Sequence, residues 1–217
     1  ETDAFRKIEA KPHSIGDVGR LLLGNARLVL VGLMLVAFTT TTFYMITTYT
    51  PTYGKTALKL DPNDVLAVTA AVGLSNLFWL PVGGAISDRI GRFPMLTAMP
   101  VAALLLAYPA MSWLVAAPSM ERLLAVVLFY SAMFGLYNGS LVVFLTELMP
   151  ANIRTAAFSL AYSLAAALFG GFTPLISTAL ISATHDRASP GLWLSVAATV
   201  SIVGVLLARR IMARRTV

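Results

Sequence analysis

Residues 28–49 read LVLVGLMLVAFTTTTFYMITTY and contain no charged side chain. A helix of about 20 mainly apolar residues crosses the roughly 30 Å hydrocarbon core of a bilayer. Five further segments of the same character follow, with no soluble domain between them: residues 65–86, 95–115, 123–145, 156–183 and 192–208. The sequence therefore predicts an all-α membrane protein with six transmembrane helices.

The composition of the 217-residue chain supports the same class. Apolar residues make up 58% of the chain and charged residues 12%, with a mean hydropathy of +0.79. Soluble domains have about 45–50% apolar residues and about 25% charged residues. The net charge of +6 would suggest a nucleic-acid partner for a soluble protein. Here the basic residues flank apolar runs, so we expect the lipid bilayer and its anionic headgroups as partner, and no nucleic acid.

The sequence has no pattern typical of an enzyme or a cofactor site. It contains no cysteine, and His13 and His185 form no cluster with acidic residues at metal-ligand spacing. Gly54-Lys55-Thr56 matches the end of a phosphate-binding loop, but the first glycine of that motif is absent. We therefore expect no catalytic residues, no metal and no cofactor.

Polar ends predict three parts along the chain. Residues 1–27 are expected to be a cytoplasmic inter-domain linker, residues 28–208 the six-helix domain, and residues 209–217 a basic cytoplasmic tail. The charged start at Glu1, without a signal peptide, suggests that the beginning of the protein is missing. Residues 14–17 have capping-box spacing and precede apolar residues on one helical face, which predicts a short amphipathic helix on the membrane surface. A linker without a stable helix is the alternative.

Basic residues determine the predicted orientation. Twelve of them lie in the two ends and in the loops after the second and fourth spans, and four lie on the opposite side. Because cytoplasmic loops carry an excess of Lys and Arg, both termini and those two loops are predicted to be cytoplasmic.

The loop after the second span reads Gly83-Gly84-Ala85-Ile86-Ser87-Asp88-Arg89-Ile90-Gly91-Arg92. Glycines let helix ends approach closely, Asp88 can accept bonds from helix N-terminal N–H groups, and the arginines can pair with carboxylates. An ordinary basic loop is the alternative, but the order of residues resembles the cytoplasmic loop motif of the major facilitator superfamily. The resemblance implies the C-terminal half of a 6+6 transporter. Phe93 departs from the motif, because family members often carry a basic residue there.

The end of the fourth span reads Glu147-Leu148-Met149-Pro150-Ala151-Asn152-Ile153-Arg154. Pro150 ends the helix and places Glu147 at its cytoplasmic mouth. A similar Glu–Pro–Arg pattern pairs with the first motif in the superfamily. The resemblance therefore implies a cytoplasmic gate made of five charged residues: Asp88, Arg89, Arg92, Glu147 and Arg154. The alternative is that Glu147 and Arg154 are interfacial residues that never meet.

Four spans carry polar residues near mid-depth, which lipid would not tolerate. The candidate cavity residues are Thr40, Tyr44, Thr47 and Thr48 on one face of the first span, Asn76, Tyr137, Asn138, and Ser159, Tyr162 and Ser163. Helix–helix hydrogen bonds are the better interpretation for Ser and Thr, whereas we interpret Asn76, Tyr137 and Asn138 as lining a wet cavity. We expect Tyr137 or Asn138 to face the central path, with the phenol of Tyr137 donating to a substrate carboxylate. Spans 95–115 and 192–208 are expected to be peripheral.

Several runs narrow the resemblance within the superfamily. Residues 43–53 (FYMITTYTPTY) and 137–139 (YNG) look like the metabolite:proton symporter group. Residues 154–163 (RTAAFSLAYS) and 169–174 (FGGFTP) resemble the bacterial citrate and tricarballylate proton symporters. The resemblance implies proton-driven uptake of a tricarboxylate across a bacterial inner membrane, with the N-terminal six-helix half as partner.

The charged residues of the chain limit that inference. Between their ends the six spans contain no Arg, Lys, His, Asp or Glu. A tricarboxylate needs cationic partners, and proton coupling needs a titratable group in the membrane, so both are expected in the N-terminal half. The alternatives are a symporter for a dicarboxylate, betaine, proline or shikimate, a six-helix channel, or a transport-inactive sensor or scaffold of the same fold.

Overall fold

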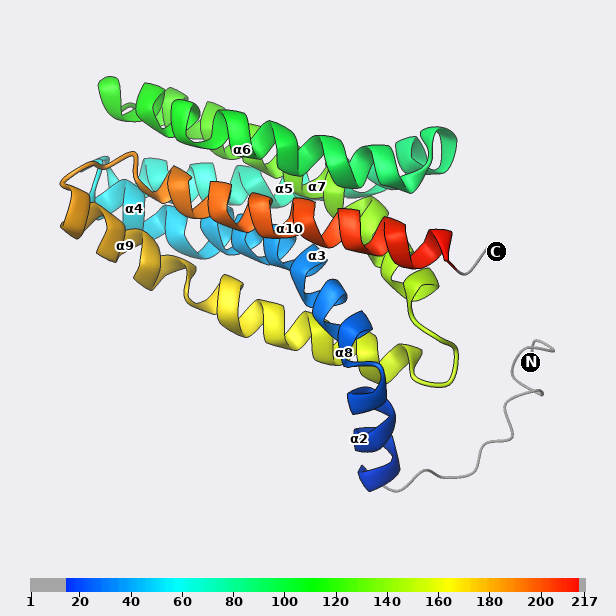
Figure 1. The fold of residues 1–217 in the computed structure, drawn as a ribbon. Coiled ribbons are helices and arrows are strands. Elements are labelled where there is room, and N and C mark those ends of the chain that lie inside the picture. Colours follow the sequence, from blue (N-terminus) through cyan, green and yellow to red (C-terminus); the bar gives the residue numbers. More distant parts are fainter. Residues whose placement is uncertain (1–14, 215–217) are drawn as a thin grey trace.

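The computed structural model describes residues 15–214, which form a bundle of long helices (Figure 1). In this part of the chain, six helices are long and apolar enough to cross a membrane: Ala26–Thr56, Pro62–Ile90, Arg92–Ala116, Met120–Leu148, Arg154–Thr184 and Pro190–Ala213. Each of the six predicted segments lies within one of these helices. The predicted spans are therefore confirmed.

The first and fifth spans each contain a π-helical segment, where the backbone makes wider turns than in an α-helix. The first span consists of α3 (Ala26–Tyr44), η1 (Met45–Tyr49) and α4 (Thr50–Thr56). The fifth consists of α8 (Arg154–Ala165), η2 (Ala166–Gly171) and α9 (Thr173–Thr184). The other spans are α5 (Pro62–Ile90), α6 (Arg92–Ala116), α7 (Met120–Leu148) and α10 (Pro190–Ala213).

Side-chain caps and one glycine define the helix ends around α5 and α7. The Asp61 carboxylate accepts a hydrogen bond from the Asn63 N–H at 2.8 Å, and Pro62 occupies the first position of α5. The Ser119 hydroxyl caps α7 by accepting from the Arg122 N–H at 3.3 Å. Gly91 separates α5 from α6 with a φ of 89°, a conformation that favours glycine. The chain therefore reverses between Ile90 and Arg92 without a loop.

A short helix, α2 (Ile15–Gly24), precedes the first span and points away from the bundle axis (Figure 1). The helix expected there is thus present. Ser14, the first residue of the predicted capping box, lies outside the described residues. The position of α2 on the membrane surface stays a prediction.

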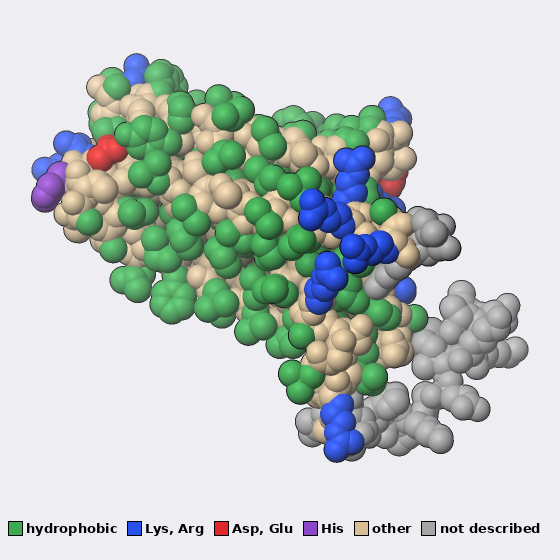
Figure 2. Space-filling model, viewed as in Figure 1, with side chains coloured by type: hydrophobic (Ala, Val, Ile, Leu, Met, Phe, Trp, Pro, Cys, Tyr) green, Lys and Arg blue, Asp and Glu red, His purple; other side chains and the backbone are tan. Residues whose placement is uncertain are grey.

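The first span and α7 form the centre of the bundle. α3 packs against α10, α8 and α7, while α5 packs along α7 and α6 packs along α10 and α7. In their most apolar windows, 72% of the first span and 56% of α7 are buried, compared with 22% for α5 and for the fifth span. On the face shown in Figure 2, apolar side chains cover the side of the bundle, and Lys and Arg lie toward its ends. This distribution is that of a protein surrounded by lipid.

The backbones of α5 and α7 touch where two pairs of glycines meet. A Cβ atom added to Gly83 would lie 2.5 Å from the Gly135 carbonyl oxygen, and one added to Gly139 would lie 2.5 Å from the Leu80 carbonyl oxygen and 2.6 Å from the Gly84 nitrogen. The neighbouring atoms are backbone atoms, which cannot rotate away. Small residues of this kind are the usual means of close helix packing in membranes.

We expect Gly139→Ala to destabilise the bundle by about 1–3 kcal/mol, because the added methyl group forces α5 and α7 apart. Gly73→Ala in α5 is the matched control, since a Cβ at Gly73 has no atom within 4 Å. Thermal unfolding of both variants in the same detergent measures the difference. Equal melting temperatures for the two variants would contradict the close contact.

Candidate functional site

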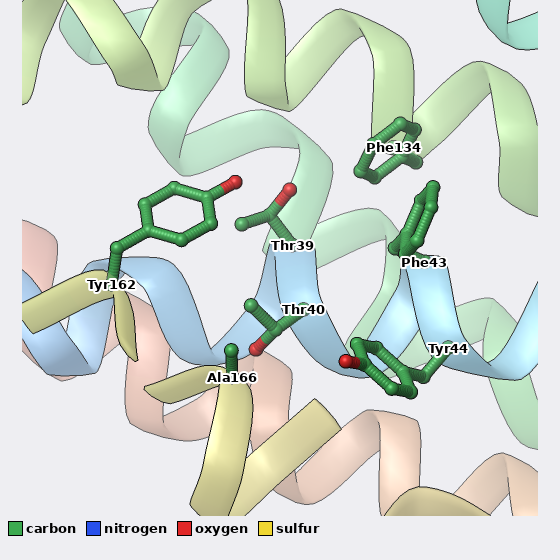
Figure 3. A pocket seen from close by; sticks show the side chains of 7 residues that line it. All are labelled: Thr39, Thr40, Phe43, Tyr44, Phe134, Tyr162 and Ala166. Carbon is green, nitrogen blue, oxygen red and sulfur yellow. The ribbon is translucent and has the colours of Figure 1, made fainter. Parts of the chain in front are cut away.

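A cavity of about 260 Å³ lies between α3, α7 and the junction of α8 with η2 (Figure 3). Its lining consists of Thr39, Thr40, Phe43, Tyr44, Phe134, Tyr162 and Ala166. The hydroxyl of Tyr162 points toward Thr39 across the cavity, and the rings of Phe43 and Phe134 lie beside each other with centroids 5.5 Å apart. The lining is therefore neutral, with aromatic rings and hydroxyl groups.

Hydrogen bonds to neighbouring helices position the two threonines. The Thr40 hydroxyl lies 3.1 Å from the Val36 carbonyl of its own helix and 3.4 Å from the Ala165 carbonyl of α8. The Thr39 hydroxyl donates to Asn138 Oδ1 of α7 at 3.1 Å. The same side chains that line the cavity thus connect α3 to its neighbours.

Both π-helical segments begin next to the cavity. Tyr44 directly precedes η1, and Ala166 is the first residue of η2. The ring of Tyr44 packs on Gly170, where an added Cβ would lie 2.8 Å from two ring carbons. The size of the cavity therefore depends on how closely these two segments approach each other.

The structure brings some of the predicted cavity residues together. Thr40, Tyr44 and Tyr162 line the cavity, and Asn138 reaches it through its bond to Thr39. Neither α6 nor α10 contributes to the lining. Sequence reasoning did not identify Thr39, Phe43, Phe134 and Ala166; the three apolar members give no signal in a chain that is apolar throughout.

Other predicted cavity residues lie outside this lining. The Thr47 hydroxyl donates to the Phe43 carbonyl at 2.6 Å and lies 3.5 Å from that of Thr48. Ser159 and Ser163 are exposed on α8. The proposal that these side chains line a cavity therefore requires a second half of the protein that encloses them. It concerns Thr47, Thr48, Ser159 and Ser163.

The prediction that Tyr137 offers its phenol to a ligand is wrong for this conformation. Tyr137 is completely buried, and its hydroxyl lies 2.7 Å from both the Leu35 carbonyl of α3 and the Ser201 hydroxyl of α10. Its ring packs edge-on against Phe38, with centroids 5.0 Å apart. Tyr137 therefore joins three helices, because a phenol in the bundle core finds its partners among the neighbouring helices.

The prediction that Asn76 lines a wet cavity is corrected in the same way. It is 8% exposed, and its Oδ1 accepts a hydrogen bond from the Ser131 hydroxyl of α7 at 2.7 Å. This bond holds α5 against α7. The alternative of a helix–helix hydrogen bond therefore describes Asn76 better than the predicted wet cavity.

A cluster of charged side chains lies where α5 ends and α6 begins. Arg92 forms an ion pair with Glu147 of α7, and its guanidinium also lies 3.9 Å from the Asp88 carboxylate. The Arg92 side chain is 24% exposed, compared with 48% for Glu147 and 73% for Asp88. The rings of Phe93 and Phe144 pack beside this cluster, with centroids 5.0 Å apart. Three of the five predicted gate residues thus meet.

The remaining two predicted gate residues lie apart from the cluster. Arg89 is exposed at the end of α5. Arg154 begins α8, and its Nε lies 3.5 Å from the Met149 carbonyl. Among the side chains that the structure describes, neither arginine forms an ion pair. A gating role for the five residues stays a prediction.

These observations define an integral membrane protein with a neutral cavity on one side of a six-helix bundle. The model of the Major Facilitator Superfamily matches residues 1–174. The chain belongs to this superfamily, and the predicted resemblance is confirmed.

Two curated relatives are citrate transporters by name. The chain is 54% identical over 200 residues to the Citrate-proton symporter of Klebsiella pneumoniae, covering 91% of this chain and 44% of that protein. It is 50% identical over 198 residues to the Citrate-proton symporter of Salmonella typhi, covering 91% of this chain and 45% of that protein.

A more distant relative is the Ectoine/proline transporter of Corynebacterium glutamicum, which is 28% identical over 217 residues. The match covers 95% of this chain and 43% of that protein. The chain therefore spans less than half the length of these relatives. No solved structure matches it.

We expect Tyr137→Phe to lower the free energy of unfolding by about 1 kcal/mol, because it removes the buried hydrogen bonds that join α7 to the Leu35 carbonyl of α3 and to the Ser201 hydroxyl of α10. The matched control is Tyr108→Phe, which removes an exposed hydrogen bond to Asp186. Thermal unfolding in detergent provides the measurement. If Tyr137→Phe proved as mild as the control, Tyr137 would not be the link between three helices described above.

Proposed function

We propose that this chain is the C-terminal half of a proton-coupled symporter for citrate or a similar tricarboxylate, which works by alternating access in a bacterial inner membrane. The observation that carries the proposal is the 54% identity to a Citrate-proton symporter along 91% of this chain. The 44% coverage of that relative leaves room for a second six-helix half. Rocking of two such halves about a central site is the usual mechanism of transporters built in this way.

The neutral cavity supports a division of roles between the halves. Its lining contains the hydroxyls of Thr39, Thr40, Tyr44 and Tyr162 and no charged group. The two threonines already donate their protons to Asn138 and to the Val36 carbonyl, so the two phenols are the donors for a carboxylate. A tricarboxylate requires Arg or Lys to balance its charge, and proton coupling requires a titratable side chain. In this proposal the N-terminal half supplies both, while this half contributes hydroxyl contacts and an aromatic wall.

The charge cluster at Arg92 fits a cytoplasmic gate. Under the positive-inside rule, both ends of this chain and the loop that holds Asp88 are cytoplasmic. The ion pair between Arg92 and Glu147 joins α6 to α7 at that side. We propose that this pair stabilises one of the two conformations of the transport cycle.

Uptake of labelled citrate into proteoliposomes tests the proposed function. The full-length protein should accumulate citrate when the external medium is more acidic, and a protonophore should abolish the accumulation. Residues 1–217 alone should give no uptake, because half of the binding site is missing, and co-expression with the N-terminal half should restore it. Accumulation of proline or betaine without citrate would support the other symporter class. No transport of any of these solutes would support a sensor or scaffold.

The variant Glu147→Gln tests the gate. An interfacial ion pair contributes up to about 1 kcal/mol, which corresponds to an approximately fivefold change in the balance of two conformations. We therefore expect an altered maximal rate of citrate uptake with little change in KM. Glu121→Gln, a change of the same type at an exposed position at the start of α7, is the control. A change in KM alone would place Glu147 in substrate binding and contradict the gate.

A further inference from the structure

An open apolar groove of about 220 Å³ lies between α2, α3 and α8. Its walls include Leu23, Leu30, Leu33, Leu160 and Leu164. Leu23 is 78% exposed and Leu30 is 55% exposed, so the groove is unfilled by the described part of the chain. Its composition suits a hydrocarbon chain better than any polar ligand.

The groove and the cavity lie on opposite sides of the contact between α3 and α8. Ala161 and Ala165 are fully buried in that contact: a Cβ on Gly32 of α3 would lie 3.1 Å from Ala161, and the Ala165 carbonyl accepts from Thr40. At 100° per residue, Leu160 and Leu164 project to one side of these alanines, and Tyr162 and Ala166 to the other. The groove therefore opens away from the cavity.

Arginines lie at the end of the groove. Arg20 is one turn before Leu23 on α2, and Arg27 is one turn before Leu30 on α3, so each shares a helical face with a leucine of the groove. Both side chains are exposed. Their guanidinium groups can therefore be reached by a ligand at the membrane surface.

The end of α10 adds positive charge at the same depth. A Cβ on Gly204 would lie 2.9 Å from Cβ of Met34, and α10 runs antiparallel to α3, so Arg209 and Arg210 reach the level of the first turn of α3. α2, α3, α8 and α10 together carry five arginines and one acidic residue. Figure 2 shows the basic side chains gathered at this end of the bundle.

We propose that the groove binds one acyl chain of an anionic phospholipid, with the lipid phosphate facing Arg20 and Arg27. The leucine walls hold the chain, and the arginines select an anionic headgroup over a zwitterionic one. Because the groove is separate from the cavity, this lipid is a structural partner of α2 and not a transported ligand.

Native mass spectrometry of the full-length protein in detergent tests the charge selection. Phosphatidylglycerol should bind more tightly than phosphatidylcholine, and Arg20→Gln with Arg27→Gln should weaken phosphatidylglycerol binding about fivefold per arginine. The control is Lys55→Gln with Lys59→Gln, which removes two exposed charges at the opposite end of the bundle. Equal binding of the two lipids, or equal loss in both double variants, would overturn the proposal.

A fluorophore on Leu160→Cys tests the occupancy of the groove. This chain has no cysteine of its own. Brominated phosphatidylglycerol should quench the label more strongly than brominated phosphatidylcholine in mixed vesicles, and the Arg20→Gln, Arg27→Gln background should remove that difference. Absence of quenching by either lipid would mean that another part of the protein covers the groove. Displacement of the lipid by soluble glycerol phosphate would indicate a simple anion site; both results overturn the proposal.

Discussion

Hydrocarbon offers no hydrogen-bond partner to a backbone or a hydroxyl group, and this constraint governs the whole molecule. Every span is helical, and the first and fifth spans each contain a π-helical segment. Threonine hydroxyls obey the same constraint by donating to the carbonyl four residues earlier in their own helix. Examples are Thr42 to Phe38, Thr69 to Val65 and Thr97 to Phe93. A hydroxyl bonded in this way uses its proton within its own helix and cannot donate it to a ligand.

The same constraint explains which features could be predicted from the sequence. Long apolar runs can form only membrane helices, so the six spans follow from composition alone. The identity of the cavity residues does not follow from composition. A polar residue in an apolar run, such as Tyr137 or Asn76, looks the same in the sequence whether it faces water or another helix. Thr47 and Thr48 lie outside the lining of this cavity for a geometric reason. Their predicted alignment with Thr40 assumes 3.6 residues per turn, and η1 changes that number between Tyr44 and Thr50.

Charge is distributed in this chain according to depth. The described ion pairs lie at the α5–α6 turn, where Gly91 allows the reversal that brings Asp88 and Arg92 together. The cavity walls are uncharged, and the remaining arginines lie near the ends of helices. Within the described residues no charged side chain is fully buried, so none requires a buried partner. If a second half of the protein holds the charged part of the binding site, as proposed, substrate preference can change there without disturbing the packing of this chain.

The contact between Gly170 and Tyr44 has a consequence for the volume of the cavity. Gly170 does not belong to the lining, yet its missing side chain is what allows the Tyr44 ring to lie against η2. A single methyl group at this position would overlap the ring and force Tyr44 to move, which would change the space that Tyr44 lines. The room in the cavity for a bulky solute thus depends partly on Gly170, a residue that packs against the lining without belonging to it.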